Sequence, residues 1–382
     1  MRVTFLTPEY TLGPSGGIRV VYEYANRLVA RGHQVTVVHP RRLRYCPPEK
    51  LTPYYRLRGW MTNMRNILVK PTIDWQPIDK RVKSLYVSSS ASSYIPEGDA
   101  IFATSWMTVR SVLECPKNRG EKFYLIQHYE TWMGPKELVD ATWRSQLHKV
   151  VIAKWLFDVG KQLGCHDMAY IPNAVDHDRY NLVRPIEGRP RRVAMLFAKV
   201  PFKGAADGIE ALRIARERYP DLRAVLFGAT NFRPSIPSWI EYHSSPAQDF
   251  IIKDIYGKSS IFLCPSWSEG FALPPAEAAA CGCAVVATEN GGVGEYIQNG
   301  VTGLLSPPRN PTALAENLCL LLGNEDLRIR LAKACNNCVS RLSWDESTAS
   351  LERFITEVLQ SSASTSTTPA KSGCKRQASQ VD

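Results

Sequence analysis

The stretch SEGFALPPAE, residues 268–277, says most about the fold of this 382-residue chain. It follows the apolar run 261–264, which is typical of a buried strand. The proline pair 274–275 cannot lie inside a helix but suits its first turn, so a helix is expected to begin there. Glu269 then lies in a strand-to-helix loop and Glu277 in the first turns of the helix. Both carboxylates face the same end of the sheet, where they can accept hydrogen bonds from the hydroxyls of a sugar and a ribose.

The loop inside this stretch offers a second kind of contact. The backbone amides of residues 270–273 can reach an oxyanion. A purely structural alternative is that Glu277 only complements the helix dipole, which is worth about 0.3–1 kcal/mol. That alternative explains one glutamate but not the whole stretch.

Strand-like and helix-like segments alternate on both sides of this stretch. Apolar runs predict strands near residues 3–6, 34–38, 100–103, 123–126 and 150–153, and again near residues 193–198, 222–227, 260–264 and 284–287. Helical patterns lie between them, for example the one that ends at Gly32. This alternation predicts an α/β protein with two doubly wound halves, each a parallel sheet with helices on both faces. Ligands of such folds bind beyond the carboxyl ends of the strands.

A pause in the alternation separates the two halves. Residues 176–190 are charged and contain prolines, so we predict an interdomain linker there. The first domain is expected to span residues 1–175 and the second residues 191–343. An amphipathic helix is expected over residues 344–360, followed by a Ser/Thr-rich disordered tail over residues 361–382.

The composition is that of an ordinary globular protein, with 44% hydrophobic and 22% charged residues. No apolar run approaches the roughly 18–20 residues that a membrane helix needs. The first nine residues are too short and too soon acidic for a signal peptide, and they are typical of a first strand. We therefore expect the protein to stay in the cytoplasm.

The ten cysteines do not predict disulfides, because several lie inside apolar segments where a free thiol behaves as a small buried hydrophobe. Cys335 and Cys338 form one C-x-x-C pair in a helical stretch. A structural zinc site needs four ligands, usually two such pairs. We expect no metal and no cofactor.

The net charge of +11 is concentrated in residues 41–83, where eleven Lys or Arg residues stand against three acids. Tyrosines, a tryptophan and methionines are interleaved with the basic residues. This combination suits the surface of an anionic membrane, to which each basic residue contributes about 1 kcal/mol. Nucleic acid is a rival partner, and a solvated loop with a few tucked aromatics is the structural alternative. Peripheral membrane contact and a solvated loop remain the two interpretations of residues 41–83, and nucleic acid is not an expected partner.

Two further motifs lie at strand ends. Gly16 and Gly17 separate the first predicted strand from the first helix, where backbone N–H groups can approach a phosphate. The alternative is a flexible turn. Lys203 closely follows the first strand of the second half, so it is expected to face the ligand cleft, and a compact ammonium suits a diphosphate. The alternative is a surface lysine in a turn.

These residues together resemble a known family. The sequence EGFALPPAEAAACG with the AVVATENGG that follows resembles the retaining GT-B glycosyltransferases of family GT4. Further similar segments are PNAVD at 172–176, NGVTGLL at 299–305, the glycine pair 16–17 and the pair 203–204. The resemblance covers most of residues 1–360 and is most specific in the second half. It implies two Rossmann-like domains that face a central cleft, with the C-terminal helix returning toward the first domain.

The resemblance also implies roles in the second domain. Glu277 would bind the ribose hydroxyls of a nucleotide-sugar donor, and Glu269 would hold the transferred sugar. The donor-binding loop would consist of Gly270, Phe271, Ala272 and Leu273. Lys203 would neutralise the leaving diphosphate, with Lys199 beside it.

In the first domain, Gly16 and Gly17 would touch the phosphate from across the cleft. His128, which follows a strand, matches the family's sugar-contacting histidine. Its alternative is a packed histidine at a strand end. His128, Lys203 and Glu269 are therefore the candidate catalytic residues.

The sequence departs from the family pattern at two positions. Ala198 stands where the family usually has an arginine, and Lys199 beside it lacks the bidentate fork of a guanidinium. Ala174 replaces the glycine of the family's junction motif. The first departure puts phosphate binding by a second cation in doubt.

The resemblance implies a metal-independent transferase that moves a sugar, with retention of configuration, from a nucleotide-sugar to a glycan or lipid-linked acceptor. Cell-surface polysaccharide biosynthesis would be its context. Residues 239–242 and 205–208 look most like the rhamnosyltransferase-like branch. The rival functions are a sugar-nucleotide epimerase, a glycogen-type synthase and a non-catalytic nucleotide-sugar sensor or scaffold, the last favoured by Ala198.

Overall fold

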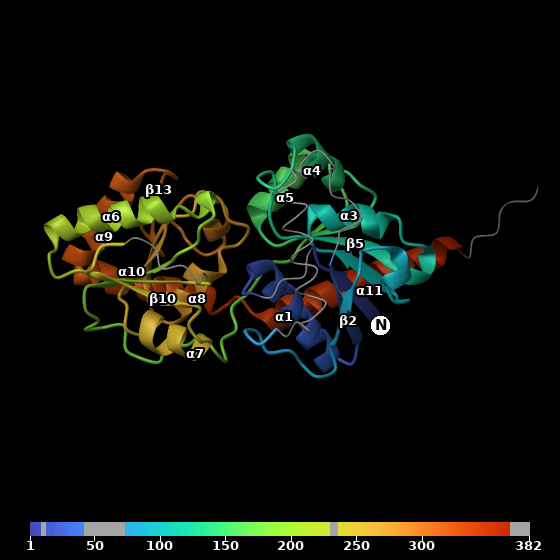
Figure 1. Ribbon diagram of the computed structural model, residues 1–382, viewed down its shortest axis with the longest axis horizontal. Helices are drawn as coiled ribbons and strands as arrows, with labels where there is room; N and C mark the ends of the chain where they lie inside the picture. The colour runs from blue at the N-terminus through green and yellow to red at the C-terminus, as the bar shows by residue number, and fades with distance from the viewer. Residues whose placement is uncertain (9–12, 42–72, 230–235, 367–382) are drawn as a thin grey trace, which may run out of the picture.

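The computed structural model describes residues 1–8, 13–41, 73–229 and 236–366. It has two lobes side by side, each built around a parallel β-sheet (Figure 1). The two doubly wound halves predicted from the sequence are thus confirmed.

The first domain contains a seven-stranded sheet in the order β3-β2-β1-β4-β5-β6-β7. Its strands are β1 (Arg2–Leu6), β2 (Gln34–Pro40), β3 (Lys83–Val87), β4 (Ala100–Ala103), β5 (Glu121–Ile126), β6 (His148–Val151) and β7 (Met168–Tyr170). The helices are α1 (Gly16–Ala30), α3 (Trp106–Leu113), α4 (Lys136–Trp143) and α5 (Lys154–Gln162). All four residues of β4 are buried, as expected for a central strand covered on both faces.

The second domain contains a six-stranded sheet in the order β10-β9-β8-β11-β12-β13. Its strands are β8 (Arg192–Leu196), β9 (Arg223–Gly228), β10 (Ile240–Ser244), β11 (Ile261–Cys264), β12 (Ala284–Thr288) and β13 (Leu304–Ser306). The helices are α6 (Ala205–Arg218), α7 (Gln248–Phe250), α8 (Leu273–Ala280), α9 (Pro311–Gly323) and α10 (Glu325–Val339). Both sheets are parallel throughout, so each domain gathers the carboxyl ends of its strands at one edge.

The last helix, α11 (Trp344–Ser366), leaves the second domain and runs along the first (Figure 1). Glu352 on α11 contacts Arg31 at 2.5 Å and His33 at 2.7 Å, just beyond α1. The expected end of this helix at residue 360 was wrong, because residues 361–366 continue it. Ser361 and Ser364 donate their hydroxyls to the carbonyls of Glu357 and Ser361, which lets serines remain in a helix. The rest of the predicted tail lies outside the described residues.

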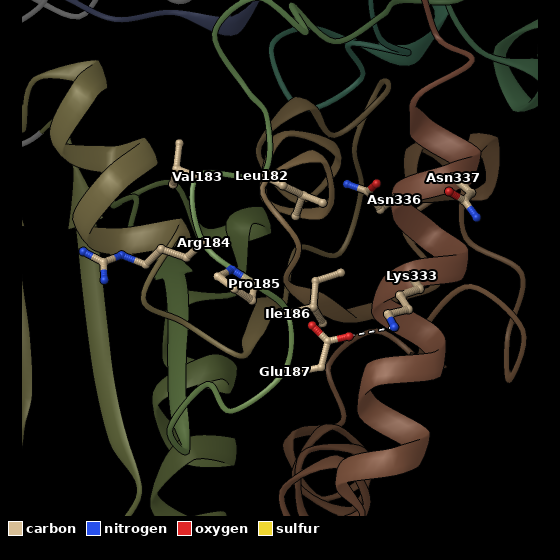
Figure 2. Close-up of a pocket in the computed structure, with 9 residues that line it drawn as sticks. All are labelled: Leu182, Val183, Arg184, Pro185, Ile186, Glu187, Lys333, Asn336 and Asn337. Carbon is tan, nitrogen blue, oxygen red and sulfur yellow. Dashed lines mark ion pairs between the residues drawn. The ribbon is translucent and has the colours of Figure 1, made fainter.

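The predicted linker, residues 176–190, is held in place by a buried arginine. Arg189 donates hydrogen bonds to five backbone carbonyls, those of Arg184, Pro185, Tyr256, Ser259 and Cys281. A groove of about 520 Å³ lies between the linker and α10. In Figure 2, Leu182 and Ile186 point from the linker toward α10, and Glu187 pairs with Lys333 at 2.6 Å.

Two expectations about other segments can be compared with this fold. Cys335 is buried and Cys338 is half-buried in α10, and the described residues contain no cluster of side chains suited to a metal ion. Within the same residues no helix has the length and apolar character needed to cross a membrane. Most of the basic segment 41–83 lies outside the described residues, so its membrane contact stays a prediction.

Candidate active site

The predicted donor loop lies between β11 and α8 and has a fixed backbone. The N–H of Glu269 donates to the carbonyl of Asn290 at 2.9 Å. Ala272 adopts a left-handed conformation with φ of 63°, which is uncommon for a residue with a Cβ, and the Tyr296 hydroxyl donates to its carbonyl at 2.6 Å. Such a strained residue persists where its surroundings hold it, and strain of this kind concentrates at functional sites.

Lys203 and Glu269 meet at the carboxyl edge of the second sheet. Lys203 ends a 3₁₀ turn (Pro201–Lys203) after β8, and its Nζ lies 2.8 Å from both carboxylate oxygens of Glu269. Gly204 fixes this turn with φ of 64°, and a Cβ there would collide with the carbonyl of Pro265. The arrangement places one ammonium and one carboxylate side by side at the predicted donor site.

Glu277 is buried and forms an ion pair across the domain boundary. Its Oε1 lies 2.6 Å from Nη1 of Arg19, which comes from the first turn of α1. Arg19 also donates to the hydroxyl of Tyr180 at 3.1 Å and stacks on its ring. Burial raises the pKa of Glu277, whereas Arg19 opposes that shift. A group at the predicted ribose site is therefore tied to the opposite domain.

The donor loop is also in direct contact with the first domain. A Cβ on Gly270 would collide with the carbonyl of Gln127, and Trp155 donates its indole N–H to the carbonyl of Gly270 at 2.9 Å. The Gln127 amide donates to the carbonyl of Gly17 at 3.2 Å. The two domains thus touch at the predicted site.

His128 follows β5 and points at the second domain. Its Nε2 lies 3.4 Å from the Ser268 hydroxyl, and its ring is surrounded by Trp132, Trp155 and Phe202 at centroid distances of 4.1, 5.5 and 6.3 Å. Burial lowers the pKa of His128 to about 4. The imidazole is therefore neutral near pH 7 and serves as a hydrogen-bonding group rather than a cation.

The sequence-predicted residues fall into three places. Around Ser268, His128 lies on the side of the first domain, and Glu269 with its partner Lys203 lies on the side of the second. Glu277 lies on α8 and contacts Arg19. Gly16 begins α1, and Gly17 adjoins Gln127. Phe271 and Ala272 are buried, and Leu273 begins α8. Lys199 is an exposed residue just past β8. The donor-binding role of each stays a prediction.

Four residues that reach these groups from elsewhere in the chain were not predicted from the sequence. Arg19, Gln127 and Trp155 each contact a predicted residue that is distant in the sequence. Tyr180 contacts Arg19 and so supports the pair with Glu277. The one local signal is at Arg19, which lies three residues after Gly16 and so within one helical turn of the glycine pair.

Glu130 is a half-buried carboxylate two residues after His128. It accepts hydrogen bonds from the Ser105 hydroxyl at 3.0 Å and from the backbone N–H of Trp106 at 2.8 Å, at the start of α3. Burial nevertheless raises the pKa of Glu130 from 4.5 to about 7. The folded state therefore holds this proton more tightly than the unfolded state does.

A pH dependence of stability follows from Glu130. The stabilisation that protonated Glu130 provides is fully present below about pH 4.5 and is lost as the pH rises to about 7. Over this range the free energy of unfolding falls by about 3 kcal/mol. The wild type is expected to lose stability between pH 5 and pH 8. Glu130→Gln is expected to lose less stability over the same range, because glutamine does not titrate. Thermal melts at both pH values measure this, and parallel profiles for the two proteins would contradict it.

Comparison with known proteins identifies part of the chain. Residues 184–337 match the family model described as "Glycosyl transferases group 1". The match lies almost entirely within the second domain. This confirms the resemblance to the GT4 glycosyltransferases, whereas the rhamnosyltransferase-like branch stays a prediction.

Among curated relatives of this group 1 domain are two transferases. An N,N'-diacetylbacillosaminyl-diphospho-undecaprenol alpha-1,3-N-acetylgalactosaminyltransferase from Campylobacter jejuni is 28% identical over 49% of this chain and 50% of its own length. A D-inositol 3-phosphate glycosyltransferase from Xylanimonas cellulosilytica is 31% identical over 38% of each chain. The chain thus spans half or less of the length of these relatives.

Solved structures resemble the whole fold. TarM from S. aureus, in complex with Fondaparinux, alpha-GlcNAc-glycerol and UDP, superposes with a TM-score of 0.72 at 11% identity, covering 93% of this chain and 100% of that chain. Sucrose-phosphate synthase from Thermosynechococcus elongatus gives 0.70 at 15% identity, covering 94% and 100%. HepE from Anabaena, in complex with UDP and glucose, gives 0.67 at 17% identity over 94% and 100%. These likenesses show the fold, and they confirm the GT-B architecture.

Proposed function

We propose that the protein is a retaining glycosyltransferase that moves a sugar from a nucleotide-sugar donor to a glycan or lipid-linked acceptor. The observation that carries this proposal is the pair of Lys203 and Glu269, held at 2.8 Å where the group 1 domain meets the first domain. The neighbouring loop 270–273 adds backbone N–H groups at the start of α8, where the helix dipole favours an anion.

The chemistry follows from these groups. The bond between the anomeric carbon and the diphosphate oxygen breaks, and a bond from that carbon to an acceptor hydroxyl oxygen forms on the same face. The acceptor O–H bond breaks as well, and its proton passes to the departing diphosphate. The departing diphosphate gains negative charge, which Lys203 stabilises. Glu269 and the neutral His128 hydrogen-bond the sugar hydroxyls. Contact between the domains excludes water, which limits hydrolysis of the donor.

The comparisons support the substrate classes of the proposal. The C. jejuni relative's name describes a diphospho-undecaprenol acceptor, and HepE was solved with UDP-glucose. We extend these to a nucleotide-sugar donor and a lipid-linked or glycan acceptor for this protein. Peripheral membrane contact by residues 41–83 would bring the protein to a lipid-linked acceptor, and cell-surface polysaccharide synthesis is the context we propose.

A panel of UDP-, GDP- and dTDP-sugars read by thermal shift tests the donor class. A ligand that binds only the folded state stabilises it by about 2.7 kcal/mol at a concentration of 100 Kd. We expect one base to raise the melting temperature by several degrees. The absence of a shift with every donor would contradict the proposal.

A non-catalytic sensor is the second candidate, because Ala198 leaves a single lysine, Lys199, where the family usually has an arginine. Such a sensor would bind a donor without consuming it. Release of the nucleoside diphosphate in the presence of acceptor, followed over many turnovers, distinguishes the two functions.

A further inference from the structure

The loop that follows β5 presents two large apolar side chains to solvent. Trp132 and Met133 are each 43% exposed. They lie at the carboxyl edge of the first sheet, four and five residues after His128. Tryptophan is enriched at contact surfaces, because it combines a large apolar ring with an N–H that can find a polar partner.

This exposure is not a result of a loose backbone, because the loop is fixed from behind. The Glu130 carboxylate is bonded to the start of α3, and the Tyr129 hydroxyl donates to Asp140 at 2.5 Å. The N–H of Met133 donates to the carbonyl of Glu130 at 3.0 Å. A Cβ on Gly134 would lie 2.5 Å from the ring of Trp106, so glycine lets the loop pack closely. The inner side chains of the loop hold it, and its outer side chains remain available.

Trp132 belongs to the candidate active site by its contacts. Its ring centroid lies 4.1 Å from that of His128 in an edge-on arrangement. It also lies 4.8 Å from Phe202 of the second domain, the residue that precedes Lys203. Both domains therefore build this aromatic surface, and it is complete when they are in contact.

We propose that Trp132 is a binding platform for the acceptor, on which the apolar face of a pyranose ring stacks. This inference rests on the proposed function and assigns part of its acceptor site. An indole offers a large, rigid apolar surface, and a pyranose has a face of C–H groups while its hydroxyls point outward. Ser268 and the pair of Lys203 and Glu269 lie on the same side as His128 and supply polar partners for those hydroxyls.

A membrane surface is a less suitable occupant of the same platform. Trp132 is packed between His128 and Phe202, next to a charged pair that a lipid surface would have to desolvate at considerable cost. A sugar ring can contact the aromatic part of the site with its C–H face and the polar part with its hydroxyls. Trp132 would then select acceptors whose ring has an unobstructed apolar face.

Binding of simple sugars tests this platform directly. The probes are the methyl glycosides of glucose, galactose, mannose and N-acetylglucosamine, read by saturation-transfer NMR on the full chain with UDP present. For at least one glycoside we expect transfer to the ring protons of one face, and Trp132→Ala to weaken its binding about fivefold to tenfold. Trp132→Phe is expected to retain most of the binding, because it keeps an aromatic face.

Tyr94→Ala is the matched control. Tyr94 is a 45% exposed aromatic in the first domain, on the connection from β3 to β4 and not on the loop that carries His128. Unchanged binding in this variant is expected. Equal glycoside binding by the wild type and Trp132→Ala would overturn the platform, and so would the absence of transfer to any glycoside in the wild type.

The donor panel separates this inference from the proposed function. If nucleotide-sugars shift the melting temperature of the wild type and Trp132→Ala equally while glycoside binding differs, the platform is supported. If the donors bind and glycoside binding is equal, the platform alone is wrong. If no donor binds and none is consumed, the proposed function fails, whatever the glycosides do.

Discussion

Replacing Lys203 with alanine is expected to lower kcat by about 10²–10³-fold, as found when one stabilising donor is removed from a developing charge. Lys203 is the cation bonded to both oxygens of Glu269, so its loss also leaves that carboxylate without its partner. The effect should fall on kcat more than on donor affinity, because the charge on the diphosphate grows as its bond to the sugar breaks. Steady-state assays with the donor identified by thermal shift measure both quantities.

Two variants control this experiment. Lys203→Arg keeps the charge but changes the geometry, and it should recover part of the rate. Lys333→Ala removes an exposed lysine that pairs with Glu187 of the predicted linker, and it should leave kcat unchanged. A kcat for Lys203→Ala within about threefold of the wild type would show that another group stabilises the leaving diphosphate.

Separating Arg19 from Glu277 is expected to have the largest effect on stability. Their side chains are 15% and 6% exposed. Loss of Arg19 leaves the buried Glu277 carboxylate without its partner, and loss of Glu277 leaves Arg19 with the more distant carboxylate of Glu23, at 4.0 Å. Such losses are about 3–5 kcal/mol, whereas replacing both charges by apolar groups is often neutral. Arg19→Met and Glu277→Met should each destabilise strongly, and the double variant should recover much of the loss.

Denaturant unfolding of the four proteins provides the measurement, and the contact between domains adds a second readout. Because the pair joins the domains, the single variants should also unfold in two separated transitions instead of one. Arg213→Ala, which breaks an exposed pair with Glu210 on α6, should unfold as the wild type does. Additive effects of the two single substitutions would show that the pair contributes nothing by its contact. Glu277→Met should also abolish the donor-induced thermal shift if this glutamate binds ribose.

The sequence was sufficient to predict those parts of the site whose signal is local. Lys203, Glu269 and His128 each come shortly after a buried strand, and in a parallel sheet that position faces the ligand edge. The alternation of strands and helices likewise predicted both sheets. Short or partly polar strands such as β7 and β13 did not stand out, because three residues carry too little periodicity.

The remaining parts of the site depend on how the two domains meet. Arg19 lies far from Glu277 in the sequence, and a surface arginine on an amphipathic helix is usually solvated. Trp132 has no periodic pattern around it. Its place in the candidate site depends on its contact with Phe202 of the opposite domain, which the sequence does not indicate. The helical state of residues 361–366 was missed for a different reason, since a serine-rich segment has weak intrinsic helix preference but can extend a helix already formed.

The chain passes between the domains twice, and the two passages are bonded to each other. The N–H of Val175 donates to the carbonyl of Leu342 at 3.3 Å, and the Ser347 hydroxyl donates to the carbonyl of Pro172 at 2.7 Å. A body attached at two neighbouring points can turn about the line through them without stretching either connection, whereas any other rotation pulls on at least one. The connections therefore favour rotation of one domain relative to the other about a single hinge axis, and this rotation would separate Gly270 from Gln127.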